Sequence, residues 1–76
     1  MSKTLADTAD GARVTIAKVD LEGDVAAWLD AVGLAAGEEV LVLRRAILGG
    51  PLHVRTSGGG EFAVAREVAV KIGVAT

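Results

Sequence analysis

Residues 38–72 have the sequence EEVLVLRRAILGGPLHVRTSGGGEFAVAREVAVKI, three short apolar segments separated by two glycine-rich turns. Val40 to Leu43 form a continuous apolar run of strand length. Residues 52–57 then alternate between apolar and polar side chains, as a half-buried strand does. Strands are therefore predicted over residues 39–46, 52–56 and 61–65. Short strands with turns at this spacing are typical of a small barrel or sandwich.

A strand and a helix are predicted before this segment. In the strand over residues 12–19, Val14 and Ile16 share one face, whereas Val19 falls out of phase, which predicts a bulge near Ala17 and Lys18. The helix is expected over residues 25–32. Its apolar side chains follow helical spacing: Val25, Trp28, Leu29 and Val32.

Both ends of the helix have recognisable signals. Asp24 is predicted to be the N-cap, because its carboxylate can accept from free backbone N–H groups. Gly33 fits the left-handed position that ends a helix, and Leu34 can fold back onto the last turn. Trp28 is expected in the core. The alternative is an exposed edge position, where Trp would be a natural anchor for a partner.

The chain is expected to form one domain over residues 1–76, with its folded core at about 11–75. A helical turn at residues 66–71 is predicted to lead into a last strand, 72–74, which pairs with the strand at 12–19. The predicted fold is mostly β: a five-stranded barrel with one short α-helix between the first two strands and a helical turn before the last.

Composition excludes several classes of protein. The chain has no cysteine, so disulfides and thiolate metal sites are ruled out. No apolar run is long enough to span a membrane, and the N-terminus lacks the apolar core of a signal peptide, so a cytoplasmic protein is expected. The net charge of −2 gives no general attraction to nucleic acid. Residues 1–39 hold eight acids and three bases, whereas residues 40–76 hold two acids and five bases.

Reactive side chains are few. His53 is the lone histidine and a weak metal candidate, since a metal site needs several convergent ligands. Asp20, Glu22 and Asp24 are better explained by helix capping and solvation than by cation binding. The glycines at 58–60 lack the lysine and helix of a phosphate-binding loop, which favours a hairpin tip. With no catalytic constellation and no cofactor motif, the sequence predicts a protein without enzymatic activity.

Four motifs in this order resemble the ferrous iron transport protein A (FeoA) family of SH3-like barrels. They are WLDAVGLAAGEEV, VLVLRRAILGGPLHVR, GGEFAVAREVAVKI and the terminal Val74. The sequence departs from the family pattern at Trp28, where an arginine is usual, and at residues 58–61, where an aromatic and a basic residue are common.

The resemblance implies a cytoplasmic accessory protein of bacterial Fe(II) uptake. Such a protein would bind and modulate FeoB, a membrane transporter with a cytoplasmic GTP-binding domain, and would reach the inner face of the membrane through it. The alternative is a transition-metal-binding or metal-sensing domain, like the SH3-like domains of metal-dependent repressors. Neither nucleic-acid binding nor membrane insertion is expected, and a homodimer through an unpaired strand edge stays open.

A partner-binding surface is predicted on the short helix and the loop around residues 48–52, where apolar residues are concentrated. Its expected members are Trp28, Leu29, Val32, Leu34, Arg45, Leu48 and Leu52.

Overall fold

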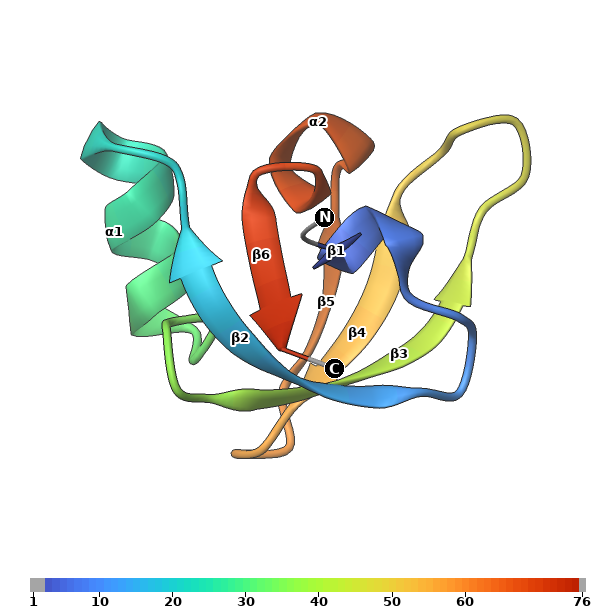
Figure 1. The fold of residues 1–76 in the computed structure, drawn as a ribbon, viewed down its shortest axis with the longest axis horizontal. Helices are drawn as coiled ribbons and strands as arrows, with labels where there is room; N and C mark the ends of the chain where they lie inside the picture. The colour runs from blue at the N-terminus through green and yellow to red at the C-terminus, as the bar shows by residue number, and fades with distance from the viewer. Residues whose placement is uncertain (1–2, 76) are drawn as a thin grey trace.

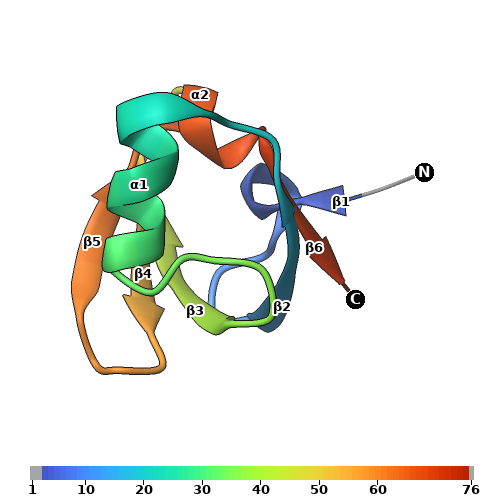
Figure 2. The ribbon, with the colours of Figure 1, turned by 90° about the vertical axis from the view of Figure 1, so that its left-hand side faces the viewer.

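A computed structural model describes residues 3–75 as one curled antiparallel sheet with two helices (Figures 1 and 2). The elements are β1 (Lys3–Thr4), η1 (Leu5–Asp7), β2 (Arg13–Val19), α1 (Gly23–Ala31), β3 (Glu39–Arg45), β4 (Leu52–Thr56), β5 (Glu61–Val64), α2 (Arg66–Ala69) and β6 (Ile72–Ala75). The order of strands in the sheet is β1-β6-β2-β3-β4-β5. This order leaves β1 and β5 at the two ends of the sheet.

Five of the six strands were predicted, with ends that differ from the structure by at most one residue. The bulge is confirmed, because the register of β2 against β6 shifts between Ile16 and Lys18. The predicted number of five strands was wrong. The additional strand is β1, which pairs with β6 through Lys3 and Thr4. Two residues are too short a segment for any alternation of polar and apolar side chains to be recognised.

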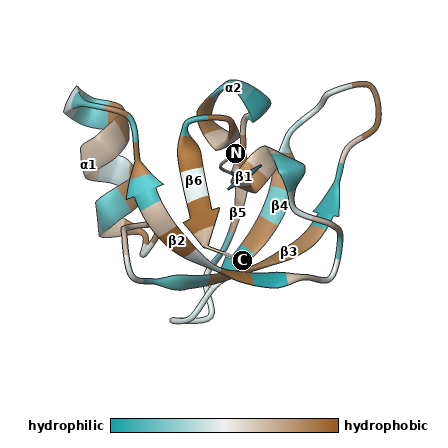
Figure 3. Cartoon of the chain, in the orientation of Figure 1, coloured by the Kyte–Doolittle hydropathy of each residue, from teal (hydrophilic) through white to brown (hydrophobic). Residues whose placement is uncertain are grey.

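The core lies inside the curled sheet and is aliphatic. Figure 3 shows hydrophobic residues alternating with polar ones along the central strands. The largest fully buried side chains come from nearly every element of the fold: Leu5, Ile16, Leu29, Leu34, Leu52, Ile72, Val40, Val42, Val54 and Val64. The sheet therefore curls around aliphatic side chains, and no buried side-chain polar atom among the described residues lacks a hydrogen-bond partner.

Helix α1 ends as predicted and begins differently. Gly33 has φ +93°, its N–H donates to Asp30 O at 3.2 Å, and the N–H of Leu34 donates to Leu29 O at 2.8 Å. This pair of bonds is the Schellman motif, which brings Leu34 back against Leu29. The predicted N-cap was wrong: Glu22 occupies that position without a side-chain bond to the helix. Asp24 lies inside the first turn, where its negative charge interacts favourably with the positive end of the helix dipole.

The N-terminal turn η1 is held by Asp7. Its carboxylate accepts from Thr4 N at 2.9 Å and from Thr4 Oγ1 at 3.2 Å. These bonds, the backbone one first, lower the pKa of Asp7. Between the paired strands β4 and β5, Arg55 donates to Glu61 at 2.7 Å, and this bond lowers the pKa of the Glu61 carboxyl.

Acid is expected to destabilise the fold through these two carboxylates. Because each has a folded-state pKa below its unfolded value, its contribution is present at neutral pH and is lost as pH falls below about 4. Urea unfolding at pH 7 and at pH 3 measures the difference. The double variant Asp7→Asn, Glu61→Gln should lose less stability between the two pH values than the unaltered chain does. An identical loss in both proteins would contradict this assignment.

Candidate partner-binding site

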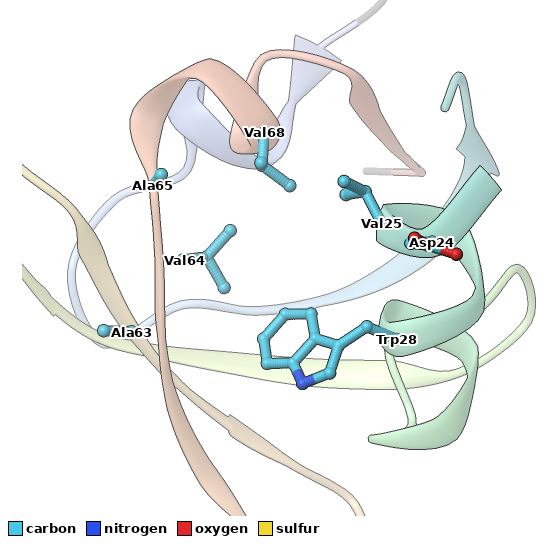
Figure 4. A pocket seen from close by; sticks show the side chains of 7 residues that line it. All are labelled: Asp24, Val25, Trp28, Ala63, Val64, Ala65 and Val68. Atoms are coloured by element: carbon cyan, nitrogen blue, oxygen red, sulfur yellow. The ribbon is translucent and has the colours of Figure 1, made fainter. Parts of the chain in front are cut away.

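An apolar hollow of about 350 Å³ lies between α1 and the β5–α2 segment (Figure 4). Val25 and Trp28 extend into it from α1, and Val64 and Val68 face them from the other wall. The remaining lining residues are Asp24, Ala63 and Ala65. Val64 points from β5 toward the helix, whereas its neighbour Ala63 points away from the hollow (Figure 4). The recess between the helix and the strand is therefore open to an apolar side chain of a partner.

Trp28 was predicted to lie in the core, and this prediction was wrong, because the residue is 45% exposed. Its indole packs edge-on against Phe62, with ring centroids 6.0 Å apart and an interplanar angle of 86°. Val25, from the same apolar stripe, is 43% exposed. The helix lies beside one end of the sheet, so only its innermost position, Leu29, is covered completely. The exposed alternative for Trp28 is therefore the one that the structure supports.

The loop between β3 and β4 carries the two most exposed large hydrophobic residues among those described, Ile47 at 84% and Leu48 at 98%. The loop is held in shape by the bonds Ala46 N to Pro51 O at 3.0 Å and Gly50 N to Ile47 O at 3.2 Å. Leu48 and Gly49 both have positive φ, +59° and +75°. A left-handed leucine with a solvent-exposed side chain is strained and gains nothing from packing.

The predicted surface divides into two. Helix α1 and the β3–β4 loop lie at opposite ends of the longest axis of the molecule in Figure 1, and Figure 2 shows α1 in front with the loop behind. The helix and the loop therefore do not adjoin, although one continuous surface was predicted. The two separate surfaces are named the α1 hollow, which consists of the seven residues that line it, and the Leu48 loop, which consists of residues 46–51.

Three of the predicted contact residues are inside the protein. Leu29, Leu34 and Leu52 are each 0% exposed and belong to the core, so their side chains are not on the surface. Val32 is half-buried beside the core. Apolar residues at the ends of short elements were assigned to the surface because the sequence does not show which side of each element the sheet covers.

Arg45 is tied to the N-terminal segment. A shift in register between Val42 and Arg44 turns β3, so that Arg45 lies opposite the buried Leu52. Its guanidinium donates to the backbone carbonyl oxygens of Ala6, at 3.1 Å, and Thr8, and its Nε donates to Asp10 at 3.4 Å. These bonds give Arg45 a structural role that its predicted place on a contact surface did not include.

His53 lies on β4, half-buried, opposite Arg44 on one side and Ala63 on the other. The neighbouring guanidinium disfavours a bound cation there. Within residues 3–75, no three side chains of His, Asp or Glu come together as a group that could hold a metal ion. No helix in the same range is long and apolar enough to cross a membrane.

Replacing Leu48 by asparagine is expected to stabilise the protein by about 0.5–1 kcal/mol, because asparagine tolerates positive φ better than leucine does. For a domain of this size, that gain raises the Tm by several degrees. Thermal unfolding followed by circular dichroism measures it. A lower Tm for Leu48→Asn would mean that the leucine makes a stabilising contact that the structure does not show.

A family comparison identifies the relatives of this chain. The model of the FeoA domain matches residues 3–76. The chain belongs to the FeoA family. Members of this family are non-catalytic accessory proteins of ferrous iron transport, and their SH3-like fold is the one described above. No curated protein sequence matches the chain.

Solved FeoA structures have the same fold. The solution structure of FeoA from Chlorobium tepidum has a TM-score of 0.86 and 32% identity, over 95% of this chain and 68% of that one. The crystal structure of Stenotrophomonas maltophilia FeoA, an SH3 domain protein complexed with zinc, has a TM-score of 0.79 and 27% identity, over 96% and 89%.

A manganese-dependent transcriptional repressor is similar in fold alone. It has a TM-score of 0.85 and 21% identity, over 97% of this chain and 36% of the repressor. The resemblance to FeoA and the expected SH3-like fold are thus both confirmed. The α1 hollow was missed in the sequence, because its walls lie more than 30 residues apart. The one available signal was Trp28, for which an exposed edge position on the helix was the alternative to the core.

Proposed function

We propose that this FeoA-family protein binds the cytoplasmic part of a FeoB-type ferrous iron transporter and modulates transport. It acts as a docking module in the cytoplasm and reaches the inner face of the membrane through its partner. The observation that supports this proposal is the α1 hollow, an apolar recess with a half-exposed tryptophan at its edge.

The residues around the hollow are unfavourably hydrated in the free protein. An exposed tryptophan beside an unfilled apolar recess leaves hydrophobic surface in water, and a partner side chain that enters would remove it. Trp28 is already oriented by its edge-on contact with Phe62, so little ordering is needed on binding. The Leu48 loop, at the other end, is a second exposed apolar feature that the same partner could contact.

A pull-down of the purified protein with the cytoplasmic domain of the transporter from the same cell tests the proposal. Trp28→Ala should lower recovery at least about tenfold, the effect of 1.4 kcal/mol, which is ordinary for an interface tryptophan. Val70→Glu is the matched control, since Val70 is 44% exposed and lies outside both surfaces. Equal recovery of Trp28→Ala and the unaltered chain, both folded, would mean that the α1 hollow does not bind the transporter.

Direct metal sensing, the alternative function, has less support. Its strongest residue candidate, His53, has an arginine beside it in the sheet. Calorimetry with Fe(II), Mn(II) and Zn(II) distinguishes the two functions. Stoichiometric binding that is lost in His53→Ala would favour metal sensing over the docking function.

A further inference from the structure

We propose that the face formed by β1, β6 and the bulge of β2 binds the anionic headgroups of a phospholipid membrane. A hollow of about 380 Å³ lies on this face, and all three lysines of the chain line it, Lys3, Lys18 and Lys71. This surface is named the lysine hollow. Its other members are Thr4, Ala17, Asp20, Val70, Gly73 and Val74. The three lysines come from segments far apart in the sequence, so only the fold brings them together.

The bulge in β2 places Lys18 on this face. Ile16 pairs with Val74, and both are buried, so strict alternation along the strand would turn residue 18 toward the core as well. Ala17 is the extra residue of the bulge, and the register resumes with Lys18 opposite Gly73. Both Ala17 and Lys18 are exposed as a result.

Gly73 leaves the floor of the lysine hollow open. It lies on β6, paired with β1 on one side and with Lys18 of β2 on the other. A Cβ added to Gly73 would lie 3.8 Å from the Cβ of Lys18 and 4.0 Å from the backbone oxygen of Lys3, so the missing side chain leaves a recess between these two lysines. The wall that carries Lys71 is tied to the end of β2, because Asp20 N donates to Lys71 O at 2.8 Å.

The three lysines keep their positive charge available. Within residues 3–75 the ion pairs all involve arginines, namely Arg13, Arg45 and Arg55. Asp20 is the one acid that lines the lysine hollow, and it forms no ion pair with the lysines. The lysine hollow therefore holds three bases and one acid, whereas the rest of the chain holds five bases and nine acids. An anionic surface is attracted to this face and repelled by the remainder of the protein.

An exposed valine among the lysines favours a membrane as the source of the anions. Val70 lines the lysine hollow and is 44% exposed. At a membrane surface, lysine ammonium groups reach the phosphates, while an apolar side chain meets the boundary with the acyl chains. A lysine is also a flexible point charge, which suits mobile headgroups better than a fixed phosphate. Nucleic acid would instead favour exposed aromatic side chains for stacking, and the two aromatic residues of the chain, Trp28 and Phe62, pack together at the α1 hollow.

Binding through the lysine hollow leaves the α1 hollow free. Figure 2 shows β1 and β6 on the opposite side of the molecule from α1 and β5. Helix α2 separates the two hollows, since Val68 lines the α1 hollow and Val70 lines the lysine hollow. Each lysine near an anionic membrane strengthens binding about fivefold, so the three together give about a hundredfold. This contact is weak by itself, but it would raise the local concentration of the protein beside a partner in the same membrane.

Co-sedimentation of the purified chain with lipid vesicles tests the proposal. Vesicles of phosphatidylcholine alone are compared with vesicles of phosphatidylglycerol and phosphatidylcholine in equal parts. In dilute salt the unaltered chain should bind the anionic vesicles at least about tenfold more strongly than the neutral ones. This preference should disappear at about 1 M salt, where the Debye length is about 3 Å.

Two double variants separate the lysine hollow from general charge. Lys18→Gln with Lys71→Gln should lower binding to the anionic vesicles about twenty-five-fold, the product of two fivefold effects. Arg13→Gln with Arg44→Gln is the matched control, because it removes two charges from exposed arginines outside the lysine hollow. The control should bind within about threefold of the unaltered chain, since charges farther from the lipid are screened. Circular dichroism confirms first that both variants are folded.

A competition with inorganic phosphate distinguishes a membrane from a free anion. Inorganic phosphate should release no more protein from the anionic vesicles than chloride does at the same ionic strength. Specific release by phosphate would make the lysine hollow a site for a free anion and overturn the proposal. The proposal is also overturned if the unaltered chain shows no preference for the anionic vesicles, or if the two double variants lose binding equally. Because no transporter is present, these outcomes are independent of the proposed function.

Discussion

Leu29→Ala is expected to lower the free energy of unfolding by about 3 kcal/mol, the usual cost of removing a fully buried leucine. Leu29 is the one residue of α1 that is completely buried, and its backbone carbonyl also accepts the bond from Leu34 that ends the helix. Truncation would leave a cavity beneath the helix and beside Leu34. The total free energy of unfolding of a domain of this length is about 4–11 kcal/mol, so the expected loss is a large share of it.

Urea unfolding measures this loss, with Val25→Ala as the control on the same helix. Val25 is 43% exposed, so its truncation should cost less than about 1 kcal/mol. Amide hydrogen exchange adds a local measurement, because α1 should lose protection before the central strands do. If the two variants lose the same stability, Leu29 does not anchor the helix to the sheet.

Arg45→Met is expected to have the second large effect, lowering the free energy of unfolding by about 2 kcal/mol. Hydrogen bonds to charged groups contribute about 1.5–3 kcal/mol, and removing the guanidinium leaves the carbonyl oxygens of Ala6 and Thr8 without that donor. Methionine keeps the length of the side chain, so the change isolates the lost donors. Since Ala6 and Thr8 are themselves buried, water can replace the guanidinium only if the N-terminal segment moves.

Arg44→Met is the matched control, because Arg44 is the exposed neighbour on the same strand. Its replacement should change stability by less than about 0.5 kcal/mol. Nuclear magnetic resonance of Arg45→Met should show the largest amide shifts in residues 5–10. A similar stability for the two variants would return Arg45 to the surface role that the sequence analysis gave it.

Local patterns in the sequence were sufficient for most of the fold. Alternation located β2, β4 and β5, and the phase error at Val19 located the bulge. The Gly33-Leu34 pair ended α1 where the structure ends it. These features depend on neighbouring residues, so a local pattern records them.

The candidate site depended on packing between distant segments, which local patterns do not record. The stripe of Val25, Trp28 and Leu29 is apolar throughout, yet only Leu29 is covered, because the helix rests at one end of the sheet. Arg45 resembles a free surface cation in the sequence until the bulge in β3 turns it toward the carbonyl groups of a segment more than 30 residues away. The hollow itself exists only once α1 and β5 are placed side by side.

Docking at the α1 hollow is tested most directly by a titration of the labelled protein with the cytoplasmic domain of the transporter. Amide signals are recorded residue by residue as the domain is added. The largest changes are predicted in α1, β5 and α2, around the Trp28 indole, with saturation that Trp28→Ala abolishes and Val70→Glu does not. Unchanged signals at those residues with the domain in excess, or changes confined to the face that carries Lys18 and Lys71, would contradict the account.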